Sequence, residues 1–177
     1  MDIGKISIGE NPPYDVNVIV EVPMGADPVK YEMDKPSGAL FVDRFLHTAM
    51  RYPGNYGFVP HTLANDGDPL DVLIVGRIPV VPGGVLRCRP LGILFMVDEQ
   101  GEDEKLLCVP HDDLHPFYSG VTSYRDLPRV LLDQIAHFFA HYKDLEEGKW
   151  VKLKRWGEVA EAAEIVRQAI ERARNAG

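Results

Sequence analysis

The segment Val85–Val109, VLRCRPLGILFMVDEQGEDEKLLCV, decides how this chain folds. Two apolar runs, Val85–Val97 and Lys105–Val109, flank the acidic stretch Asp98-Glu99-Gln100-Gly101-Glu102-Asp103-Glu104. Apolar runs separated by a short polar stretch that contains glycine are typical of two antiparallel strands joined by a turn. The segment therefore predicts a β-hairpin with an acidic tip, which would bring the carboxylates of Asp98 and Asp103 close to each other.

Shorter strand patterns precede this hairpin. Val16–Val22 alternates between apolar and polar residues, Val29–Met33 and Ala39–Val42 flank a turn at Lys35–Gly38, and Asp71–Val75 is apolar. Glycine and proline punctuate these runs, as they do in sheets made of short strands. We expect a small antiparallel sheet that is closed or strongly curled.

The last third of the chain has a helical period. Apolar residues recur every three or four positions after Leu127, with Asp126 as the expected cap, an early Pro128 and Gly148 just past the end. The apolar positions are Leu131, Ile135, Phe138, Tyr142 and Leu145. A second amphipathic helix is predicted from about Glu158 to Arg174. Strands followed by helices indicate an α+β fold, and no repeat or linker divides the chain, so we expect one domain over residues 1–177.

The composition argues against several classes of protein. The 27 acidic residues outnumber the 19 basic ones, and a net charge of -8 disfavours a general binder of nucleic acids or anionic membranes. No apolar run approaches the roughly 20 residues of a membrane span, and the N-terminus lacks the profile of a signal peptide. We expect a cytoplasmic protein in which Cys88 and Cys108 are buried thiols without zinc or redox chemistry.

The stretch Asp66-Gly67-Asp68-Pro69-Leu70-Asp71 concentrates three carboxylates in six residues. Carboxylates that converge repel one another, and the repulsion is relieved by a proton or by a cation. Gly67 permits a bend and Pro69 restricts Asp68 to an extended conformation, so the three side chains can face one point. Magnesium suits such oxygen ligands, and Asp98 and Asp103 of the hairpin tip would complete the site. The alternative is an ordinary acidic surface turn.

The sequence disfavours two other kinds of metal site. A calcium EF-hand needs glycine at the sixth loop position and glutamate at the twelfth, where this chain has Asp71 and Arg77. His137 and His141 have a spacing that can bind zinc, but the glutamate of the catalytic zinc motif is replaced by Phe138. We favour packing or a subunit contact for the histidines.

Six segments together resemble the family I soluble inorganic pyrophosphatases, in particular the short bacterial members. They are Ala26–Glu32 (ADPVKYE), Gly38–Arg44 (GALFVDR), Tyr52–Gly57 (YPGNYG), Asp66–Val72 (DGDPLDV), Gly101–Asp103 (GED) and His141–Glu146 (HYKDLE). The resemblance covers nearly the whole chain. It implies a five-stranded antiparallel barrel of the oligonucleotide-binding type with two flanking C-terminal helices, and magnesium-dependent hydrolysis of pyrophosphate to two orthophosphates by in-line attack of a metal-activated water.

The resemblance also implies roles for individual residues. Asp68 would be the general base. The metal ions would be held, directly or through water, by Asp66, Asp71, Asp98, Asp103, Glu21 and Glu32. Substrate binding would fall to Lys30, Arg44, Tyr52, Tyr56, Lys105, Tyr142 and Lys143, with Tyr52 supporting the pocket. Taken singly, each of these lysines, arginines and tyrosines is more often a solvated charge or a packed ring.

Two further functions compete with the enzyme. A non-catalytic nucleic-acid-binding barrel would need a basic, aromatic surface, which the net charge opposes. A calcium-binding structural protein is opposed by the missing loop glycine and glutamate. Bacterial members of the resembled family are commonly hexamers, so we expect a homo-oligomer, with His137, His141 and Asp144 as candidate contact residues.

Overall fold

The predicted hairpin at Val85–Val109 is the longest strand pair of the fold. The computed structural model describes residues 1–176, so Gly177, the last residue of the expected domain, lies outside the described residues. The strands and α-helices are β1 Val16–Val22, β2 Val29–Asp34, β3 Ala39–Phe45, β4 Asn55–Phe58, β5 Asp71–Ile74, β6 Val85–Asp98, β7 Gly101–Pro110, α1 Arg129–His141, β8 Val151–Gly157 and α2 Val159–Ala176. Short 3-10 helices lie at Ile3–Lys5, Pro116–Tyr118 and Tyr124–Asp126.

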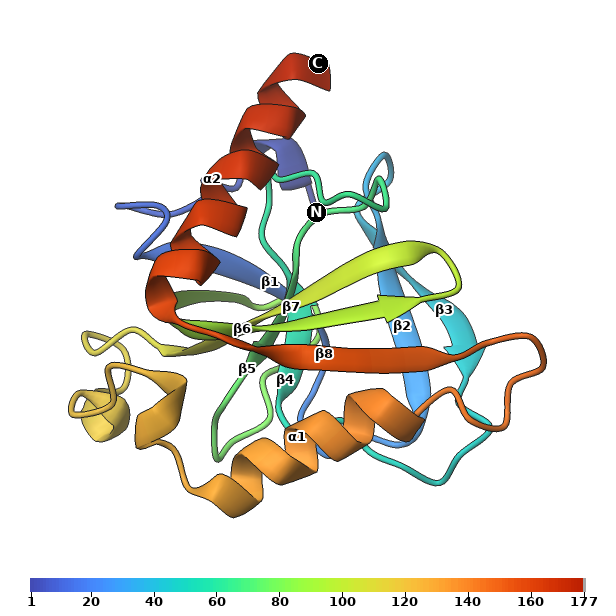
Figure 1. The fold of residues 1–177 in the computed structure, drawn as a ribbon. Coiled ribbons are helices and arrows are strands. Elements are labelled where there is room, and N and C mark those ends of the chain that lie inside the picture. Colours follow the sequence, from blue (N-terminus) through green and yellow to red (C-terminus); the bar gives the residue numbers. More distant parts are fainter. Residues whose placement is uncertain (177) are drawn as a thin grey trace.

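The strands form one large sheet and one separate hairpin. The large sheet has the order β1-β4-β5-β7-β6-β8, and β1 also pairs with β6, so the pairing returns to its first strand with β8 added beyond β6. Strands β2 and β3 form the separate hairpin, which stands at the right of the molecule in Figure 1. The pairs are antiparallel except for β5 and β7, which run parallel with Val72 opposite Leu106. The α+β class is confirmed, but the expected count of five antiparallel strands is wrong.

Strands β4 and β8 account for part of that difference. Strand β4 has four residues and lies in a segment whose proline and glycine indicate a turn. Strand β8 lies between the two helices and is only partly buried. It pairs antiparallel with β6, and Leu153 lies opposite Met96. Its place is fixed by the exposed edge of a distant strand, which local periodicity does not reveal.

The β6–β7 hairpin is tighter than the sequence indicated. Asp98 lies opposite Gly101, and Asp103 lies opposite Met96, so only Glu99 and Gln100 form the turn. Both Asp98 and Asp103 are buried. The acidic stretch is therefore mostly strand, and its carboxylates belong to a wall of the fold instead of a solvated tip.

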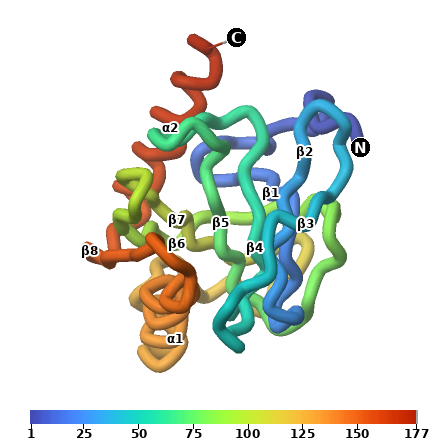
Figure 2. Tube along the Cα trace, turned by 90° about the vertical axis from the view of Figure 1, so that its right-hand side faces the viewer, coloured from blue at the N-terminus to red at the C-terminus, as the bar shows by residue number. Residues whose placement is uncertain are grey.

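Two apolar clusters lie on opposite faces of the strands. Leu73 and Leu107 belong to the cluster that includes α1, whereas Val72 and Leu106 belong to the cluster that includes α2. Alternate residues of a strand point to opposite faces, so each helix covers a different apolar surface. Figures 1 and 2 both show α1 below β8 and α2 above it.

The helix boundaries differ slightly from the prediction. The α1 helix begins at Arg129 after Pro128, and Asp126 instead accepts the backbone N–H groups of Thr122 at 2.9 Å and Ser123 at 3.0 Å. Asp126 therefore caps the preceding 3-10 helix, and its prediction as the α1 cap was wrong. Leu145 was expected on the buried stripe but is exposed, because α1 ends at His141 and the chain turns outward.

The second helix and the cysteines match expectation. Ala162, Val166 and Ala169 of α2 are buried. Cys88 and Cys108 are buried free thiols. Within residues 1–176, no helix has the length and apolar character needed to cross a bilayer.

Candidate active site

A polar cleft of about 560 Å³ lies between the β2–β3 hairpin, the acidic loop before β5, the β6–β7 hairpin and the turn after α1. Ten acidic and six basic side chains line it, so acidic groups outnumber basic groups by four. The predicted site residues that line the cleft are Glu21, Lys30, Glu32, Arg44, Tyr56, Asp66, Asp68, Asp71, Asp98, Asp103, Lys105, Tyr142 and Lys143. Tyr52 is the one predicted residue that does not line it.

The acidic loop is both a tight turn and a wall of the cleft. Asp66 Oδ1 accepts the backbone N–H of Asp68 at 3.0 Å, and Gly67 adopts a positive φ of 92° that a residue with a Cβ would resist. Burial, together with the charges of Asp71 and Asp68, raises the pKa of Asp66. Asp66 therefore experiences the charges of both Asp68 and Asp71.

Lys105 is the central cation of the cleft. Its Nζ lies 2.5 Å from Asp71 Oδ2 and 2.6 Å from Asp103 Oδ1. Burial alone would lower the pKa of Lys105, but Asp71, Tyr56 and Asp103 outweigh it and raise the pKa well above its usual value. Burial raises the pKa of Asp103, although Lys105 opposes that shift. Tyr56 adds a hydrogen bond from its hydroxyl to Asp71 Oδ2 at 2.6 Å.

A second buried ion pair joins the hairpin to the turn after α1. Lys143 Nζ donates to Asp98 Oδ2 at 2.7 Å, and the backbone N–H of Gln100 donates to Asp98 Oδ1 at 2.8 Å. Burial would raise the pKa of Asp98, but the two hydrogen bonds and the charge of Lys143 lower it below its usual value. Asp98 is therefore a stable anion at neutral pH.

Glu21 on β1 is the most perturbed carboxyl of the cleft. Its Oε1 accepts the backbone N–H of Met33 at 2.7 Å, which ties β1 to β2. Burial raises the pKa of Glu21 to about 8, despite the hydrogen bond from Met33. On β2, Lys30 donates to Glu32 and lies 3.4 Å from Asp43 Oδ2.

Tyr52 supports the cleft from behind. Its ring centroid lies 5.0 Å from that of Tyr56 and 4.7 Å from that of Phe138, and the side chain is buried. Burial raises the pKa of Tyr52 well above its usual value, so its hydroxyl stays neutral. The structure thus places it against the residues that face the cleft.

Several lining residues were missed by the sequence reasoning. Lys35 contacts Asp68 at 3.6 Å, Asp43 lies beside Lys30, and Lys149 lies 3.9 Å from Glu99. Phe41 and Asp34 also line the cleft. Asp43 adjoins Arg44 in one of the quoted segments, which was an available signal, whereas nothing local marks Lys149.

The donor chemistry of the cleft fits a hard divalent cation. Its oxygen donors are carboxylates, which magnesium prefers, and such an ion would offset the excess of acidic over basic groups. Among residues 1–176, however, no three acidic, cysteine or histidine side chains form a ready ligand cluster. Lys105 stands between Asp71 and Asp103 in place of such a cluster. The carboxylate side chains are flexible and can adjust to an ion.

The cleft therefore offers two complementary kinds of group. Carboxylates suited to a divalent cation line one part, and the ammonium, guanidinium and phenol groups of Lys30, Arg44, Tyr142 and Lys143 are donors suited to phosphoryl oxygens. Clefts that combine such groups support phosphoryl chemistry by positioning and charge stabilisation.

Comparison with known proteins identifies the family. The inorganic pyrophosphatase family model matches residues 18–174. An inorganic pyrophosphatase of Caulobacter vibrioides is 66% identical over 172 residues, covering 97% of both chains. A structure described as an inorganic phosphatase from Anaplasma phagocytophilum has a TM-score of 0.94 and 51% identity, covering 96% of this chain and 99% of that one. A structure of an inorganic pyrophosphatase from Coxiella burnetii has a TM-score of 0.91 and 50% identity, covering 94% and 99%. The chain belongs to the inorganic pyrophosphatase family.

Proposed function

We propose that this protein is an enzyme that hydrolyses inorganic pyrophosphate to two orthophosphates with magnesium as its cofactor. The observation that carries the proposal is the cleft that unites the acidic loop at 66–71 with the cations of β2, β3, β7 and the turn after α1. Pyrophosphate is a compact polyanion, so it needs several cations on more than one side. The full-length similarity to inorganic pyrophosphatases supports the same conclusion.

The basic side chains would bind and orient the substrate. Lys30, Arg44, Lys105 and Lys143 reach the cleft from four different elements. Each ammonium or guanidinium can donate charge-assisted hydrogen bonds to phosphoryl oxygens. Charge that develops on the departing phosphate would be stabilised by the same groups, which are already in place before the reaction.

Asp68 is the best placed proton acceptor of the acidic loop. Its side chain is 75% exposed, and its only ion-pair partner among residues 1–176 is Lys35 at 3.6 Å. Asp71, in contrast, is held by Lys105 and Tyr56. A carboxylate with free oxygens can take a proton from a water that attacks phosphorus in line, so no covalent intermediate on the protein is required.

The metal would be held by Asp66, Asp71, Asp98 and Asp103, with Glu21 and Glu32 placed to accept hydrogen bonds from its waters. Bound magnesium would lower the pKa of a water and screen the charge of the phosphates. Lys105 lies between Asp71 and Asp103, and its positive charge opposes the rise that burial causes in the pKa of Asp103.

One assay tests the proposal. Phosphate release from pyrophosphate is measured with the purified protein in magnesium and in EDTA. Release is expected only in magnesium and should disappear when the metal is chelated. No release with any divalent metal would refute the assignment.

Three finer features belong to the same proposal. We infer that residues 1–177 make one catalytic domain, and that β1, β4, β5, β7 and β6 act as a closed barrel of the oligonucleotide-binding type, because each of them pairs with two neighbours. We also place the enzyme in the cytoplasm, which suits its two free thiols.

The last feature is the oligomeric state. We infer that the protein forms a homo-oligomer, and a hexamer is the state to be tested. His137, His141 and Asp144 are exposed, and His141 Nδ1 lies 2.6 Å from Asp144 Oδ2. This outward polar group at the C-terminal end of α1 and in the turn after it is available to another copy of the chain. Sedimentation is expected to give a single species larger than the monomer, and a stable monomer would overturn this part.

A further inference from the structure

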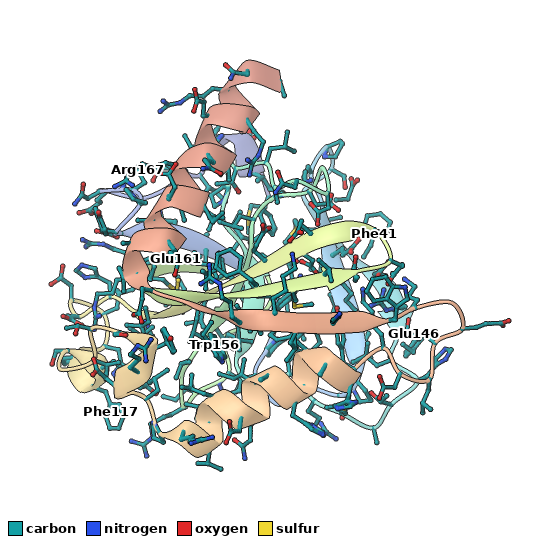
Figure 3. All side chains as sticks on the ribbon, in the orientation of Figure 1. Phe41, Phe117, Glu146, Trp156, Glu161 and Arg167 are labelled. Atoms are coloured by element: carbon teal, nitrogen blue, oxygen red, sulfur yellow. The ribbon has the colours of Figure 1, made fainter. Side chains whose placement is uncertain are left out.

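A buried carboxylate lies behind the cleft, against a cation that lines it. Glu146 follows α1 and is not among the lining residues, and its Oε1 lies 3.0 Å from Nε of Arg44. Both side chains are largely buried. Figure 3 shows Glu146 beyond the end of α1, on the same side of the molecule as Phe41 of β3. The contact joins residues 102 positions apart, since Arg44 lies in β3 and Glu146 in the turn after α1.

The nitrogens of the Arg44 guanidinium lie in different surroundings. Nε is fully buried, so the atoms of Arg44 that reach the cleft belong to the rest of the side chain. Nη1 lies 3.5 Å from Asp43 Oδ2, which also lines the cleft. Glu146 therefore places a negative charge behind Nε, and the terminal nitrogens of the guanidinium are left for a ligand.

Stability alone does not account for this pair. Within the described residues, Arg44 Nε has no well-aligned hydrogen bond, and the buried Glu146 Oε2 has no partner. A buried ion pair with an unsatisfied oxygen gains little against its desolvation cost. The charge of Glu146 is close enough to hold the Arg44 guanidinium. An orienting role for Glu146 therefore explains the arrangement better than a stabilising one.

Two neighbouring contacts extend the same connection. The ring of His47 lies 3.1 Å from the carbonyl oxygen of Leu145, and the Thr48 hydroxyl donates to the carbonyl oxygen of Tyr142 at 3.4 Å. The turn after α1 is therefore attached to the end of β3 at three points. That turn also carries Tyr142 and Lys143 into the cleft.

We propose that Glu146 is a positioning residue, which sets the Arg44 guanidinium relative to Tyr142 and Lys143 so that they bind one phosphoryl group together. This inference rests on the proposed pyrophosphatase function. Glu146 acts through Arg44 and does not touch the substrate itself.

The first test is Glu146→Gln, which keeps the shape of the side chain and removes its charge. The KM for pyrophosphate is expected to rise about tenfold while kcat changes less than about twofold, because a misdirected cation weakens binding in the ground state and the transition state alike. The affinity for inorganic phosphate should fall in parallel. Glu147→Gln is the matched control, since Glu147 is the next residue, is exposed and undergoes the same charge change. It should leave KM unchanged.

The second test asks whether the effect passes through Arg44. In an Arg44→Lys background, where the guanidinium is already gone, Glu146→Gln should change KM by less than about twofold. Glu146→Asp, which keeps the charge, should restore much of the affinity lost in Glu146→Gln. Thermal unfolding is recorded for every variant.

The outcomes separate this inference from the proposed function. If the wild-type protein releases no phosphate, the proposed function fails. The positioning role alone is overturned if the wild type is active but Arg44→Lys and Glu146→Gln raise KM by factors that multiply in the double variant. It is also overturned if Glu146→Gln has the same KM as Glu147→Gln. Failure of both Glu146 variants to fold would also overturn it, because Glu146 would then be a structural residue.

Discussion

Lys105→Met is the most informative perturbation of the cleft. Methionine keeps most of the apolar stem of lysine but removes the charge that lies between Asp71 and Asp103. The Lys105 side chain is only 5% exposed, so water cannot replace the missing charge. Two carboxylates would then face each other without their shared cation.

Breaking a buried ion pair by removing one partner typically costs about 3–5 kcal/mol. Asp71 keeps the Tyr56 hydroxyl and is partly exposed, which favours the lower end of that range. A loss of about 3 kcal/mol in the free energy of unfolding corresponds to a fall in Tm of about 6–12 °C for a chain of this size. The exposed pair of Lys154 and Glu102 offers a matched control, because Lys154→Met should cost less than about 1 kcal/mol.

The assay is urea and thermal unfolding in EDTA, at one protein concentration for all variants. Added magnesium should reduce the difference between Lys105→Met and the wild type, because a bound divalent cation supplies countercharge to the same carboxylates. If Lys105→Met were no less stable in EDTA than Lys154→Met, the electrostatic account of the cleft would be refuted.

Three other predictions follow from local geometry. Asp68→Asn should lower kcat at neutral pH by at least about a hundredfold with little change in magnesium affinity, whereas full activity of this variant would exclude Asp68 as the base. Gly57→Ala should destabilise the protein, because the new Cβ would lie 1.9 Å from the Ile19 carbonyl oxygen; Gly120→Ala, with no atom within 4 Å and no positive φ, should cost far less in chemical unfolding. The pKa of Asp126 is lowered by backbone hydrogen bonds from Thr122 and Ser123, so its stabilising effect is full above the unfolded pKa of about 3.9 and is lost as the pH falls through the lower folded value. Asp126→Asn should therefore be less stable than the wild type at pH 7, and the gap should close in acid; a gap independent of pH would contradict this.

The sequence was most informative where a structure depends on neighbouring residues. The 3.6-residue period of α2 and the first apolar run of the hairpin were predicted at nearly their observed positions, whereas β7 begins four residues before its predicted start at Lys105. Prediction failed where a side chain had more than one possible hydrogen-bond partner nearby in the sequence. Asp126 was expected to cap α1, but its carboxylate accepts the backbone N–H groups of Thr122 and Ser123 instead.

The candidate site was predicted in its composition more than in its geometry. Thirteen of the 14 predicted residues line one cleft, but their identification depended on family resemblance, since isolated lysines and tyrosines in strands carry no local signal. Tyr52 was assigned with them and lies behind the cleft. Glu146 belonged to a quoted segment, yet its partner is 102 positions away, which no local pattern indicates.

The sequence by itself determined the α+β class, the β6–β7 hairpin and the concentration of carboxylates in the loop at 66–71, because periodicity and turn residues act over a few neighbours. Only the tertiary structure decided that β8 pairs with β6, that Lys105 joins Asp71 to Asp103, and that Glu146 stands behind Arg44. Those arrangements depend on contacts between distant segments, whose free energy comes from packing, charge and desolvation in the folded chain.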